Sequence, residues 1–374
     1  MPGDDNRSVV LIQRRETYMS DRTDARFTMQ CLGLYVMSLV LLFSAGCGRK
    51  EQAVDLYVDA VMLKELEESE MAIESLNSAV QLNKRFSLAY SLLGEIYQEI
   101  KDYEKSAASY EKATELNPWS FKDYFNLGRV YQIVKKFAQA VKAYARACEL
   151  KPDHLEAHIN VAKCYYEIKD YNEALAAAVQ AEQIDPNVSE IQKMLGDIYE
   201  SRKDYEQAIR SYKRALEIDS NNPGIMTSLA VCYLRTNRNE PAEELLTSVI
   251  QIQPDNNTAY QHLGYCYLLL RQQAFESYKR ALETDSNTPG IETSLMEYLD
   301  KSIESYSRAI EINDKNWEAH RGLGVAYVLK AIRDKNDALK TKAVEQWRLS
   351  LDIKPEQANR NRLLKYIRIY STQK

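Results

Sequence analysis

The residues best suited to chemistry are few in this chain and lie apart. Four histidines, His154, His158, His262 and His320, show no His/Cys spacing that would hold a metal ion. No G-x-x-x-x-G-K, G-x-S-x-G or H-E-x-x-H motif occurs, and the carboxylates are spread along the chain instead of clustering. We therefore expect no enzyme activity, no cofactor and no metal site, and we interpret the histidines as packing residues.

Three of the cysteines share one spacing. Cys164, Cys232 and Cys266 are separated by multiples of 34 residues, so they occupy one position of a recurring unit. Because a free Cys behaves as a small hydrophobic residue, we expect these three in the core. Free thiols are unusual in an oxidising compartment, which argues mildly against export.

Length and charge narrow the class of protein further. At 374 residues the chain is either several domains or one elongated repeat structure. Gly (12) and Pro (9) are sparse and hydrophobic residues make up 45%, as in a folded, helix-rich protein. The net charge of -5 provides no basic excess to neutralise phosphates, so nucleic acid is not expected as a partner.

The amino terminus contains a short apolar segment, residues 31–43, that ends in Ser44, Ala45, Gly46 and Cys47. About 20 apolar residues are needed to span a membrane, so this run better suits the central region of a signal peptide. The Ser-Ala-Gly-Cys ending resembles the lipobox of bacterial lipoproteins. That resemblance implies that Cys47 is lipidated and becomes the new amino terminus.

Two other interpretations of this segment are an uncleaved anchor over residues 31–47 and an ordinary cleaved signal. Arg14 and Arg15 precede the apolar run, and positive residues stay on the cytoplasmic side, so each interpretation exports the rest of the chain. Gly48 after the cysteine resembles lipoproteins sorted to the outer membrane. We expect residues 1–47 to anchor the chain in the bacterial cell envelope, facing the periplasm.

A strict period organises the chain after this segment. Tyrosines recur every 34 residues, each preceded three residues earlier by Gly or Ala, at Tyr97, Tyr131, Tyr165, Tyr199, Tyr233 and Tyr267. Within each unit two apolar stretches of helical period flank a polar turn such as residues 101–103. Each unit is therefore predicted to be a helix-turn-helix.

Small residues within these helices indicate close packing. Gly in a helix interior costs about 1 kcal/mol relative to Ala, so its recurrence at position 8 of the unit requires a compensating contact. We expect this position to let the first helix of each unit (helix A) approach the second (helix B), with alanines at positions 20 and 27 facing it. The tyrosines at positions 11 and 24 are expected to fill the spaces between units.

This pattern resembles the tetratricopeptide repeat (TPR) family. The unit 121–154 shows the family's complete constellation: Tyr124, Leu127, Gly128, Tyr131, Ala140, Tyr144, Ala147 and Pro152. The resemblance implies an all-α, right-handed superhelical solenoid of antiparallel helix-turn-helix units. We delimit nine units, 53–86, 87–120, 121–154, 155–188, 189–222, 223–256, 257–288, 289–316 and 317–357, followed by a capping helix from Gln357 to about Tyr370.

The period breaks in two consecutive units. Relative to the period, two residues are missing between Tyr267 and Ala281 and six between Leu299 and Ser302. The larger deletion removes the turn between the two helices of its unit. Residues 290–312 are therefore predicted to form one long helix, and the superhelix to kink or open. We expect residues 48–288 to form an array of seven repeats and residues 289–374 an irregular module of two repeats and the capping helix.

Two further irregularities accompany the break. Residues 211–229 and 277–295 are identical at 16 of 19 positions, which indicates an internal duplication followed by deletions. The last unit gains seven residues within 330–342. We favour a tolerated extension of its helices over a docking element.

The TPR resemblance also implies a binding groove, lined by positions 2, 5, 9, 12 and 13 of each helix A. Two stretches are expected to grip a peptide or helix: Lys122, Phe125, Asn126, Arg129, Ile159, Asn160, Lys163 and Tyr166, then Val231, Leu234, Arg235, Tyr265, Leu268 and Leu269. Exposed leucines in the second stretch would indicate a partner, because each stabilises by roughly 1.5 to 3 kcal/mol when buried. Alternatively, the shortened turn near Arg271 lets helices collapse over this patch.

These features together predict a non-enzymatic scaffold that binds a partner protein and is tethered to a membrane. Two alternatives remain from the sequence. The array is a self-associating structural spacer built through residues 289–316, or it is the regulatory subunit of an envelope enzyme complex. The identity of the partner cannot be predicted from the sequence.

Overall fold

The computed structural model describes residues 48–283 and 291–371, and within these ranges the chain consists of helices and turns without a strand. It divides into two compact units, one ending at Val134 and one beginning at Lys135, which we describe separately. The expected anchor segment with Cys47, and the expected domain boundary between residues 288 and 289, lie outside the described residues. In the described part, no helix combines the length and the apolar composition that crossing a membrane requires.

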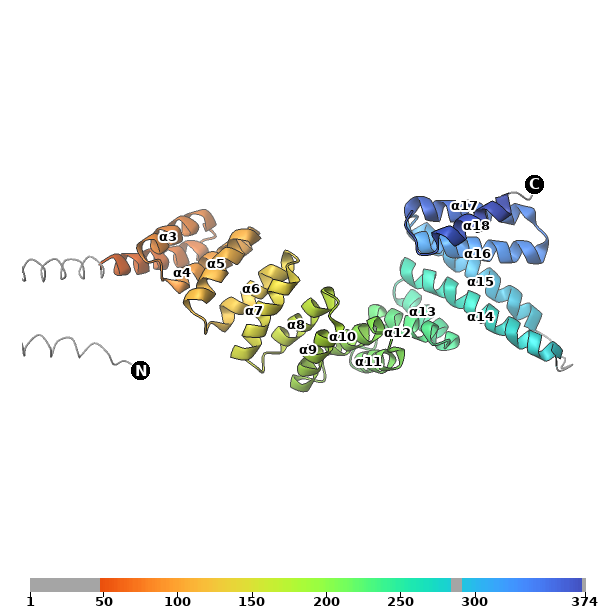
Figure 1. Ribbon diagram of the computed structural model, residues 1–374, viewed down its shortest axis with the longest axis horizontal. Helices are drawn as coiled ribbons and strands as arrows, with labels where there is room; N and C mark the ends of the chain where they lie inside the picture. The colour runs from red at the N-terminus through yellow and green to blue at the C-terminus, as the bar shows by residue number, and fades with distance from the viewer. Residues whose placement is uncertain (1–47, 284–290, 372–374) are drawn as a thin grey trace, which may run out of the picture. The chain divides into compact units, whose positions relative to one another are not determined.

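The first unit begins with a helix over residues 48–65. Four more helices follow it in sequence: α3 (Ser69–Leu82), α4 (Ser87–Glu99), α5 (Tyr103–Leu116) and α6 (Phe121–Ile133). Successive helices run antiparallel and lie side by side (Figure 1). The predicted repeats 53–86 and 87–120 are therefore confirmed as helix pairs.

The second unit continues the pattern through α13 and then changes. Its regular helices are α7 (Phe137–Leu150), α8 (Leu155–Glu167), α9 (Tyr171–Ile184), α10 (Ser189–Ser201), α11 (Tyr205–Ile218), α12 (Pro223–Arg235) and α13 (Asn239–Ile252). The remaining helices are longer or irregular: α14 (Asn257–Glu283), α15 (Ile291–Ile312), α16 (Trp317–Asp334), α17 (Asp337–Ile353) and α18 (Arg360–Ser371).

The turn between helix A and helix B uses one backbone conformation throughout the regular repeats. A left-handed residue, which costs a non-Gly residue roughly 1 to 2 kcal/mol, recurs every 34 residues at Glu67, Lys101, Lys135, Lys169, Lys203 and Asn237. An Asp follows several of these residues and caps the next helix. Asp102, for example, accepts a hydrogen bond from the Lys105 backbone N–H at 3.2 Å. The capping and tertiary packing of helix B offset the local cost.

The small residue at position 8 brings the two helices of a repeat together. A Cβ added to Gly94 on α4 would lie 2.8 Å from the ring of Tyr110 on α5, and Tyr110 is fully buried. Ser106 on α5 also donates a hydrogen bond to the Gly94 carbonyl at 2.7 Å. The tyrosine at position 24 thus packs over the glycine of its own repeat, a contact that the expected place between repeats did not include.

Helices α14 and α15 replace two of the expected units by one long hairpin (Figure 1). The prediction of a single helix over residues 290–312 is confirmed for residues 291–312, which form α15. Helix α14, however, also continues through Arg271, where the period placed a turn and where no left-handed residue occurs. The deletions removed the turn residues of both units, so neither helix reverses direction at its middle.

The outer part of this hairpin is an insertion within one repeat. Ser302 on α15 donates to the Gly264 carbonyl on α14 at 2.9 Å, and a Cβ on Gly264 would lie 2.9 Å from the Tyr306 ring. These contacts reproduce those of Ser106 and Tyr110 with Gly94. The second half of α15 therefore serves as helix B for the first half of α14.

The duplicated sequence occupies matching ends of helices in its two places. Residues 211–229 cover the end of α11 and the beginning of α12, which belong to successive repeats. Residues 277–295 cover the end of α14 and the beginning of α15, which belong to one hairpin.

The last three helices enclose an indole. Trp347 on α17 is 2% exposed, and its ring lies 5.7 Å from that of Tyr366 and 6.0 Å from that of Tyr370 on α18. Helix α18 therefore caps α16 and α17, as predicted for the carboxy-terminal end. The extension of α16 pairs Lys330 with Asp300 on α15 at 2.5 Å, so it lies against a neighbouring helix.

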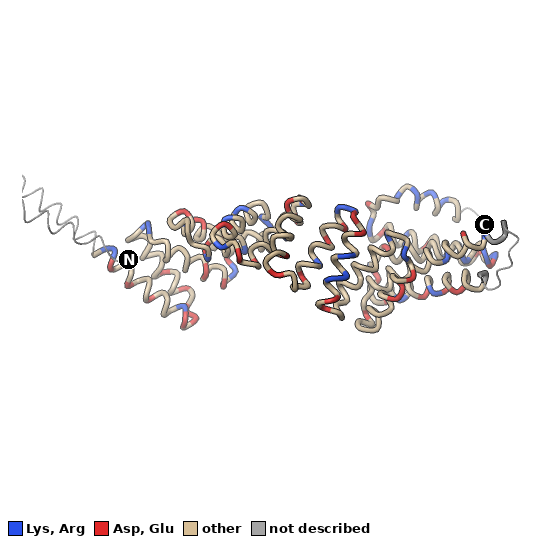
Figure 2. The backbone as a smooth tube through the Cα atoms, turned by 90° about the horizontal axis from the view of Figure 1, so that it is seen from below, with Lys and Arg blue, Asp and Glu red and all other residues tan. Residues whose placement is uncertain are grey.

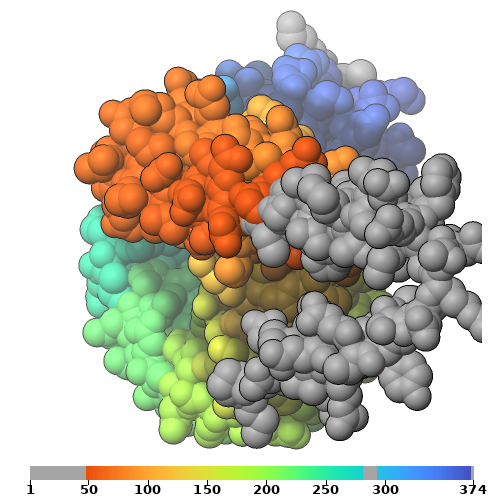
Figure 3. Space-filling model, turned by 90° about the vertical axis from the view of Figure 1, so that its left-hand side faces the viewer, coloured from red at the N-terminus to blue at the C-terminus, as the bar shows by residue number. Residues whose placement is uncertain are grey.

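The first described helix has an exposed apolar stripe. Val54, Val58 and Met62 are spaced four residues apart and are 49%, 47% and 54% exposed. Four-residue spacing places them on one face of the helix. Figure 3 looks toward this end of the chain, where residues near 50 to 90 appear in red to orange.

Candidate functional site

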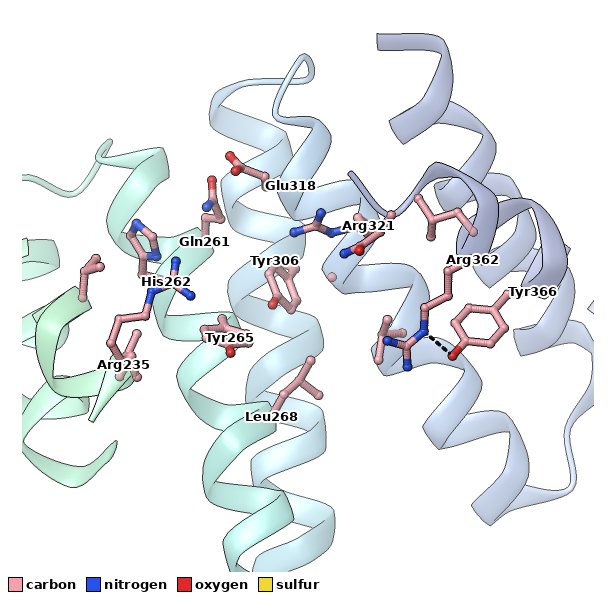
Figure 4. Close-up of a pocket in the computed structure, with 16 residues that line it drawn as sticks. Arg235, Gln261, His262, Tyr265, Leu268, Tyr306, Glu318, Arg321, Arg362 and Tyr366 are labelled. Atoms are coloured by element: carbon pink, nitrogen blue, oxygen red, sulfur yellow. Dashed lines mark hydrogen bonds between the residues drawn. The ribbon is translucent and has the colours of Figure 1, made fainter. Parts of the chain in front are cut away.

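A cavity of about 600 Å³ opens within the second unit and joins helices from three repeats and the cap. We call it the arginine pocket. Its lining comes from α12, α14, α15, α16 and α18 (Figure 4): Val231, Leu234, Arg235, Gln261, His262, Tyr265, Leu268, Tyr306, Glu318, Arg321, Gly322, Val325, Asn359, Arg362, Leu363 and Tyr366.

The long hairpin brings these helices together. Because α15 supplies helix B for α14, the next helix A along the surface is α16, and α14 contacts α16 directly. Residues at positions 5 and 9 of α14, Gln261 and Tyr265, therefore share the cavity with Arg321 and Val325, which hold the same positions in α16. The helical insertion is accommodated without entering the cavity.

Tyr306 forms the floor of the arginine pocket and is held from two sides. A Cβ on Gly264 would lie 2.9 Å from the Tyr306 ring, and one on Gly322 would lie 2.2 Å from it. Only residues without a side chain fit at these positions of α14 and α16. Tyr306 is 3% exposed, and burial raises the pKa of its hydroxyl far above the ordinary range, so the floor is an uncharged aromatic surface.

Three guanidinium groups project around this floor from different helices (Figure 4). Arg321 lies 5.0 Å from the Trp317 ring, and Arg362 donates from Nε to the Tyr366 hydroxyl at 2.7 Å. Across residues 48–283 and 291–371, neither of these arginines nor Arg235 forms an ion pair. Three permanent charges thus surround the floor, and none of them is within ion-pair distance of a carboxylate in the described part of the chain.

The remaining titratable groups leave the arginine pocket cationic. Burial, and then the Arg235 charge, lower the pKa of His262 to about 4, so this imidazole is neutral at pH 7. Glu318 is the acidic residue among those that line the cavity. Three arginines and one carboxylate leave a net charge of +2, in a chain whose total is -5.

Charged residues outside the lining act in both directions. Glu200 on α10 interacts electrostatically with Arg235, but burial raises the pKa of the Glu200 carboxyl and its Oε2 accepts a hydrogen bond from Tyr212 at 3.0 Å. Helix α18 adds basic residues at Arg360, Lys365 and Arg368 and contains no acidic residue, whereas both signs are interspersed along the chain as a whole (Figure 2).

Most of the second predicted stretch lines the arginine pocket. Val231, Arg235, Tyr265 and Leu268 do so with their side chains at least partly exposed. Leu234 also lines the wall but is only 5% exposed, because it belongs to the core cluster around Tyr212 and Tyr233.

The expectation that Leu234 is an exposed anchor is therefore wrong. Leu269 packs against the same core cluster and does not line the cavity. The alternative prediction, that helices pack over this patch, therefore holds for Leu234 and Leu269. It does not hold for the other predicted residues of the stretch, which remain partly exposed.

The first predicted stretch is divided between the two units. In the first unit Lys122 pairs with Glu95 at 2.8 Å, Phe125 is 9% exposed and stacks on Phe121, and Arg129 is exposed. Asn126 is half-buried.

In the second unit the corresponding side chains are also engaged. Ile159 and Asn160 are 6% and 8% exposed, and Lys163 pairs with Glu190 at 2.6 Å. The Tyr166 hydroxyl lies 3.0 Å from Ser201 Oγ. In this stretch Lys122, Lys163 and Tyr166 make polar contacts and Phe125, Ile159 and Asn160 are buried, so Arg129 is the exposed side chain that lacks an ion pair among the described residues.

Sequence reasoning missed several lining residues, and for two different reasons. Glu318, Arg321 and Val325 hold positions 2, 5 and 9 of the unit 317–357, so the rule already applied to earlier units would have found them. Arg362 and Tyr366 lie on the capping helix, where no repeat position applies.

The remaining histidines and the cysteines have structural surroundings. His154 caps α8, accepting from the Ala157 N–H at 3.2 Å, and His320 is 5% exposed between Gln346 and the Asp314 carbonyl. Cys164, Cys232 and Cys266 are fully buried free thiols, and burial raises the pKa of each to about 12. The expectation that these cysteines lie in the core is confirmed.

Comparison with solved structures supports the fold. A chain in the crystal structure of the APC/C hetero-tetramer Cut9-Hcn1 is 14% identical and has a TM-score of 0.51, covering 80% of this chain and 52% of that one. The TPR protein YrrB, whose structure is described as having an unusual peptide-binding site, is 21% identical over 50% of this chain and 96% of its own, with a TM-score of 0.45. PilF of Pseudomonas aeruginosa is 19% identical over 62% and 94%, with a TM-score of 0.46.

Comparison of the sequence identifies the family. No curated protein matches this chain. The family model described as the cilia and flagella-associated protein 70 C-terminal domain, a TPR domain, matches residues 50–293, which is more than half of the chain. This chain therefore belongs to the TPR family of the cilia and flagella-associated protein 70 C-terminal domain.

Proposed function

We propose that this chain is a non-enzymatic scaffold that holds a segment of a partner protein in the arginine pocket. The observation that carries the proposal is the convergence of three repeats and the cap on one cavity that combines an aromatic floor, aliphatic walls and unpaired guanidinium groups. Recognition sites combine apolar surface with polar groups that fix the orientation of the ligand, and this lining contains both kinds. Its TPR fold, which presents successive helices along a surface, suits binding of a peptide or helix.

Site-specific cross-linking tests the binding site. Tyr265 is 42% exposed at the rim of the arginine pocket, and Phe275 is 47% exposed on the same helix α14 but outside it. A photo-reactive phenylalanine analogue at each position, activated in native membranes with the full chain, should give a discrete protein adduct from position 265 only. No adduct at 265, or the same adduct from both positions, would contradict the proposal.

We also propose that Cys47 tethers the scaffold to the bacterial cell envelope as a lipoprotein facing the periplasm. The support is the sequence pattern of residues 31–47 and its lipobox resemblance. Two or more acyl chains hold a protein stably at a membrane, since each buried methylene contributes about 0.8 kcal/mol.

Metabolic labelling separates the three interpretations of the amino terminus. The native chain should incorporate an alkyne fatty acid, and Cys47→Ala should lose both the label and the membrane attachment. Attachment without label in the native chain would indicate an uncleaved anchor, and export without attachment would indicate an ordinary signal peptide. Cys31→Ala serves as the matched control and should keep the label.

A further inference from the structure

The charges of the arginine pocket differ from those of the rest of the helix A surface. Elsewhere in the described chain, three groove-facing lysines have carboxylate partners: Lys122 with Glu95, Lys163 with Glu190, and Lys193 with Asp197 at 2.6 Å. Arg129 is a single exposed cation without an ion pair among the described residues, whereas the arginine pocket gathers three. Arg235, Arg321 and Arg362 have none within the described residues. A cluster of like charges that the protein leaves unneutralised favours binding of the opposite charge.

We propose that the segment bound in the arginine pocket is acidic, presenting about two carboxylates to Arg235, Arg321 and Arg362 and an apolar side chain to the floor at Tyr306. This inference rests on the proposed function and specifies the chemistry of the partner. Arg binds carboxylates through two parallel hydrogen bonds, which makes it the residue suited to this recognition.

The surroundings of the guanidinium groups favour a peptide over a simple ion. Arg321 and Arg362 each lie beside an aromatic ring, at 5.0 Å from Trp317 and 5.4 Å from Tyr366, which restricts their orientation. Leu268, Val325 and Leu363 line the space between the charges. An occupant that satisfies both features carries apolar and acidic groups together, as a protein segment does.

Two sources can supply such carboxylates: Asp and Glu side chains within a chain, or the carboxylate at its end. Both satisfy the same guanidinium groups. The peptide recovered from the adduct at position 265 distinguishes them, because mass spectrometry shows whether it is an internal acidic segment or a carboxy terminus. A synthetic copy of that peptide, with its acidic side chains changed to amides or with its terminus amidated, then identifies which group competes.

The decisive experiment measures the adduct at position 265 in full-length charge variants. Arg235→Gln/Arg321→Gln/Arg362→Gln should reduce its yield about 10- to 100-fold, because charge-assisted hydrogen bonds are lost. The matched variant Lys122→Gln/Lys163→Gln/Lys193→Gln removes the same total charge from paired lysines and should retain the yield. An Arg→Lys version of the first variant, which keeps the charge, should retain part of it and shows that the fold survives.

The outcomes separate the proposed binding site from the proposed acidic chemistry of its partner. Equal yields in the Arg→Gln and Lys→Gln variants would overturn the acidic partner and leave the binding site standing. No adduct even from the native arginines would overturn the proposed function and this inference together. Displacement by an oligonucleotide but not by the acidic peptide would also overturn the inference, since it would show recognition of phosphates.

Discussion

The helix A surface behaves differently in the regular repeats and around the arginine pocket. At two junctions of the regular repeats, position 9 of one unit forms an ion pair with position 2 of the next. Glu95 pairs with Lys122 at 2.8 Å, and Lys163 pairs with Glu190 at 2.6 Å, so the same geometry appears with the signs exchanged. At the arginine pocket position 9 is Val231, Tyr265 or Val325, and none of these uncharged side chains can form such a pair.

This contrast shows how one fold forms both a surface whose charges are paired and a surface whose charges are available to a ligand. Exposed ion pairs contribute only about 0 to 1 kcal/mol each, but they remove unpaired charge from the surface. Where the pairs are absent, guanidinium groups remain available to a ligand. The long α14–α15 hairpin adds to this, because it brings α16 and the cap to the side of α14.

Truncating the floor of the arginine pocket should have the largest effect. Tyr306 is 3% exposed, so Tyr306→Ala should destabilise the second unit by about 3 to 5 kcal/mol. Tyr212, its counterpart in a regular repeat, is fully buried and should cost a similar amount. Urea unfolding followed by circular dichroism measures both.

Removing only the hydroxyl should separate the two tyrosines. The Tyr212 hydroxyl lies 2.7 Å from Asp197 Oδ1 and 3.0 Å from Glu200 Oε2 and donates its single proton between these carboxyl groups, so Tyr212→Phe should cost about 1 to 3 kcal/mol. Within residues 48–283 and 291–371 the Tyr306 hydroxyl has no hydrogen-bond partner, so Tyr306→Phe should cost less. Equal losses of stability would show that the hydroxyls of Tyr306 and Tyr212 contribute equally, which would contradict this difference.

Acidification should destabilise the unit through His262. Its pKa is lowered from 6.5 to about 4 by burial and by Arg235. The unfolded chain therefore takes up the proton first, and stability should fall as the pH decreases from about 6.5 to about 4, by up to about 3 kcal/mol.

The variant His262→Gln should flatten this part of the pH profile, and the matched variant His158→Gln should leave it unchanged. Urea midpoints measured at several pH values provide the comparison. A slope that persists in His262→Gln would assign it to other groups.

Equivalent glycines should respond equally if α15 completes the repeat begun by α14. A Cβ would lie 2.8 Å from a tyrosine ring at Gly94 and 2.9 Å at Gly264. Overpacking of this kind costs about 1 to 3 kcal/mol, so Gly94→Ala and Gly264→Ala should each lower the urea midpoint. A harmless Gly264→Ala would mean that α15 does not take the place of helix B.

Breaking an ion pair of the regular repeats should have the smallest effect on stability. Glu95 accepts from both Lys64 and Lys122, and its side chain is 30% exposed. Glu95→Gln should cost at most about 1 kcal/mol while leaving Lys122 unpaired, since Lys64 keeps its pair with Glu99 at 3.1 Å. If unpaired cations are what makes a surface receptive, this variant should bind a fluorescent poly-glutamate probe more tightly than the native chain does, and an unchanged affinity would weaken the comparison.

Much of the fold was predictable because it depends on local spacing. The 34-residue period of tyrosines and small residues predicted the helix pairs. The close contact between Gly94 and Tyr110 lies within one such pair. The missing turn residues predicted the continuous helix α15. They did not reveal that α14 is also continuous, or which helix it pairs with, because pairing depends on contacts between residues about 40 apart, such as Gly264 and Tyr306.

The candidate site was predictable only where the repeat numbering applies. Arg235 and Tyr265 were found by their positions in helix A, and Arg321 was open to the same rule. Leu234 was wrongly predicted to be exposed, because position 12 of α12 faces a core cluster to which the α14–α15 hairpin contributes. The place of Arg362 in the site depends on how α18 packs against α16 and α17, and the repeat pattern of the sequence does not predict that packing.

The most direct test is hydrogen exchange of the full chain with and without the partner segment recovered from position 265. If the arginine pocket is the binding site, amides within residues 231–235, 261–268 and 318–325 should exchange more slowly in the complex, and those of residues 91–99 in α4 should be unchanged. Protection confined to residues 91–99, with none around the arginine pocket, would contradict the account.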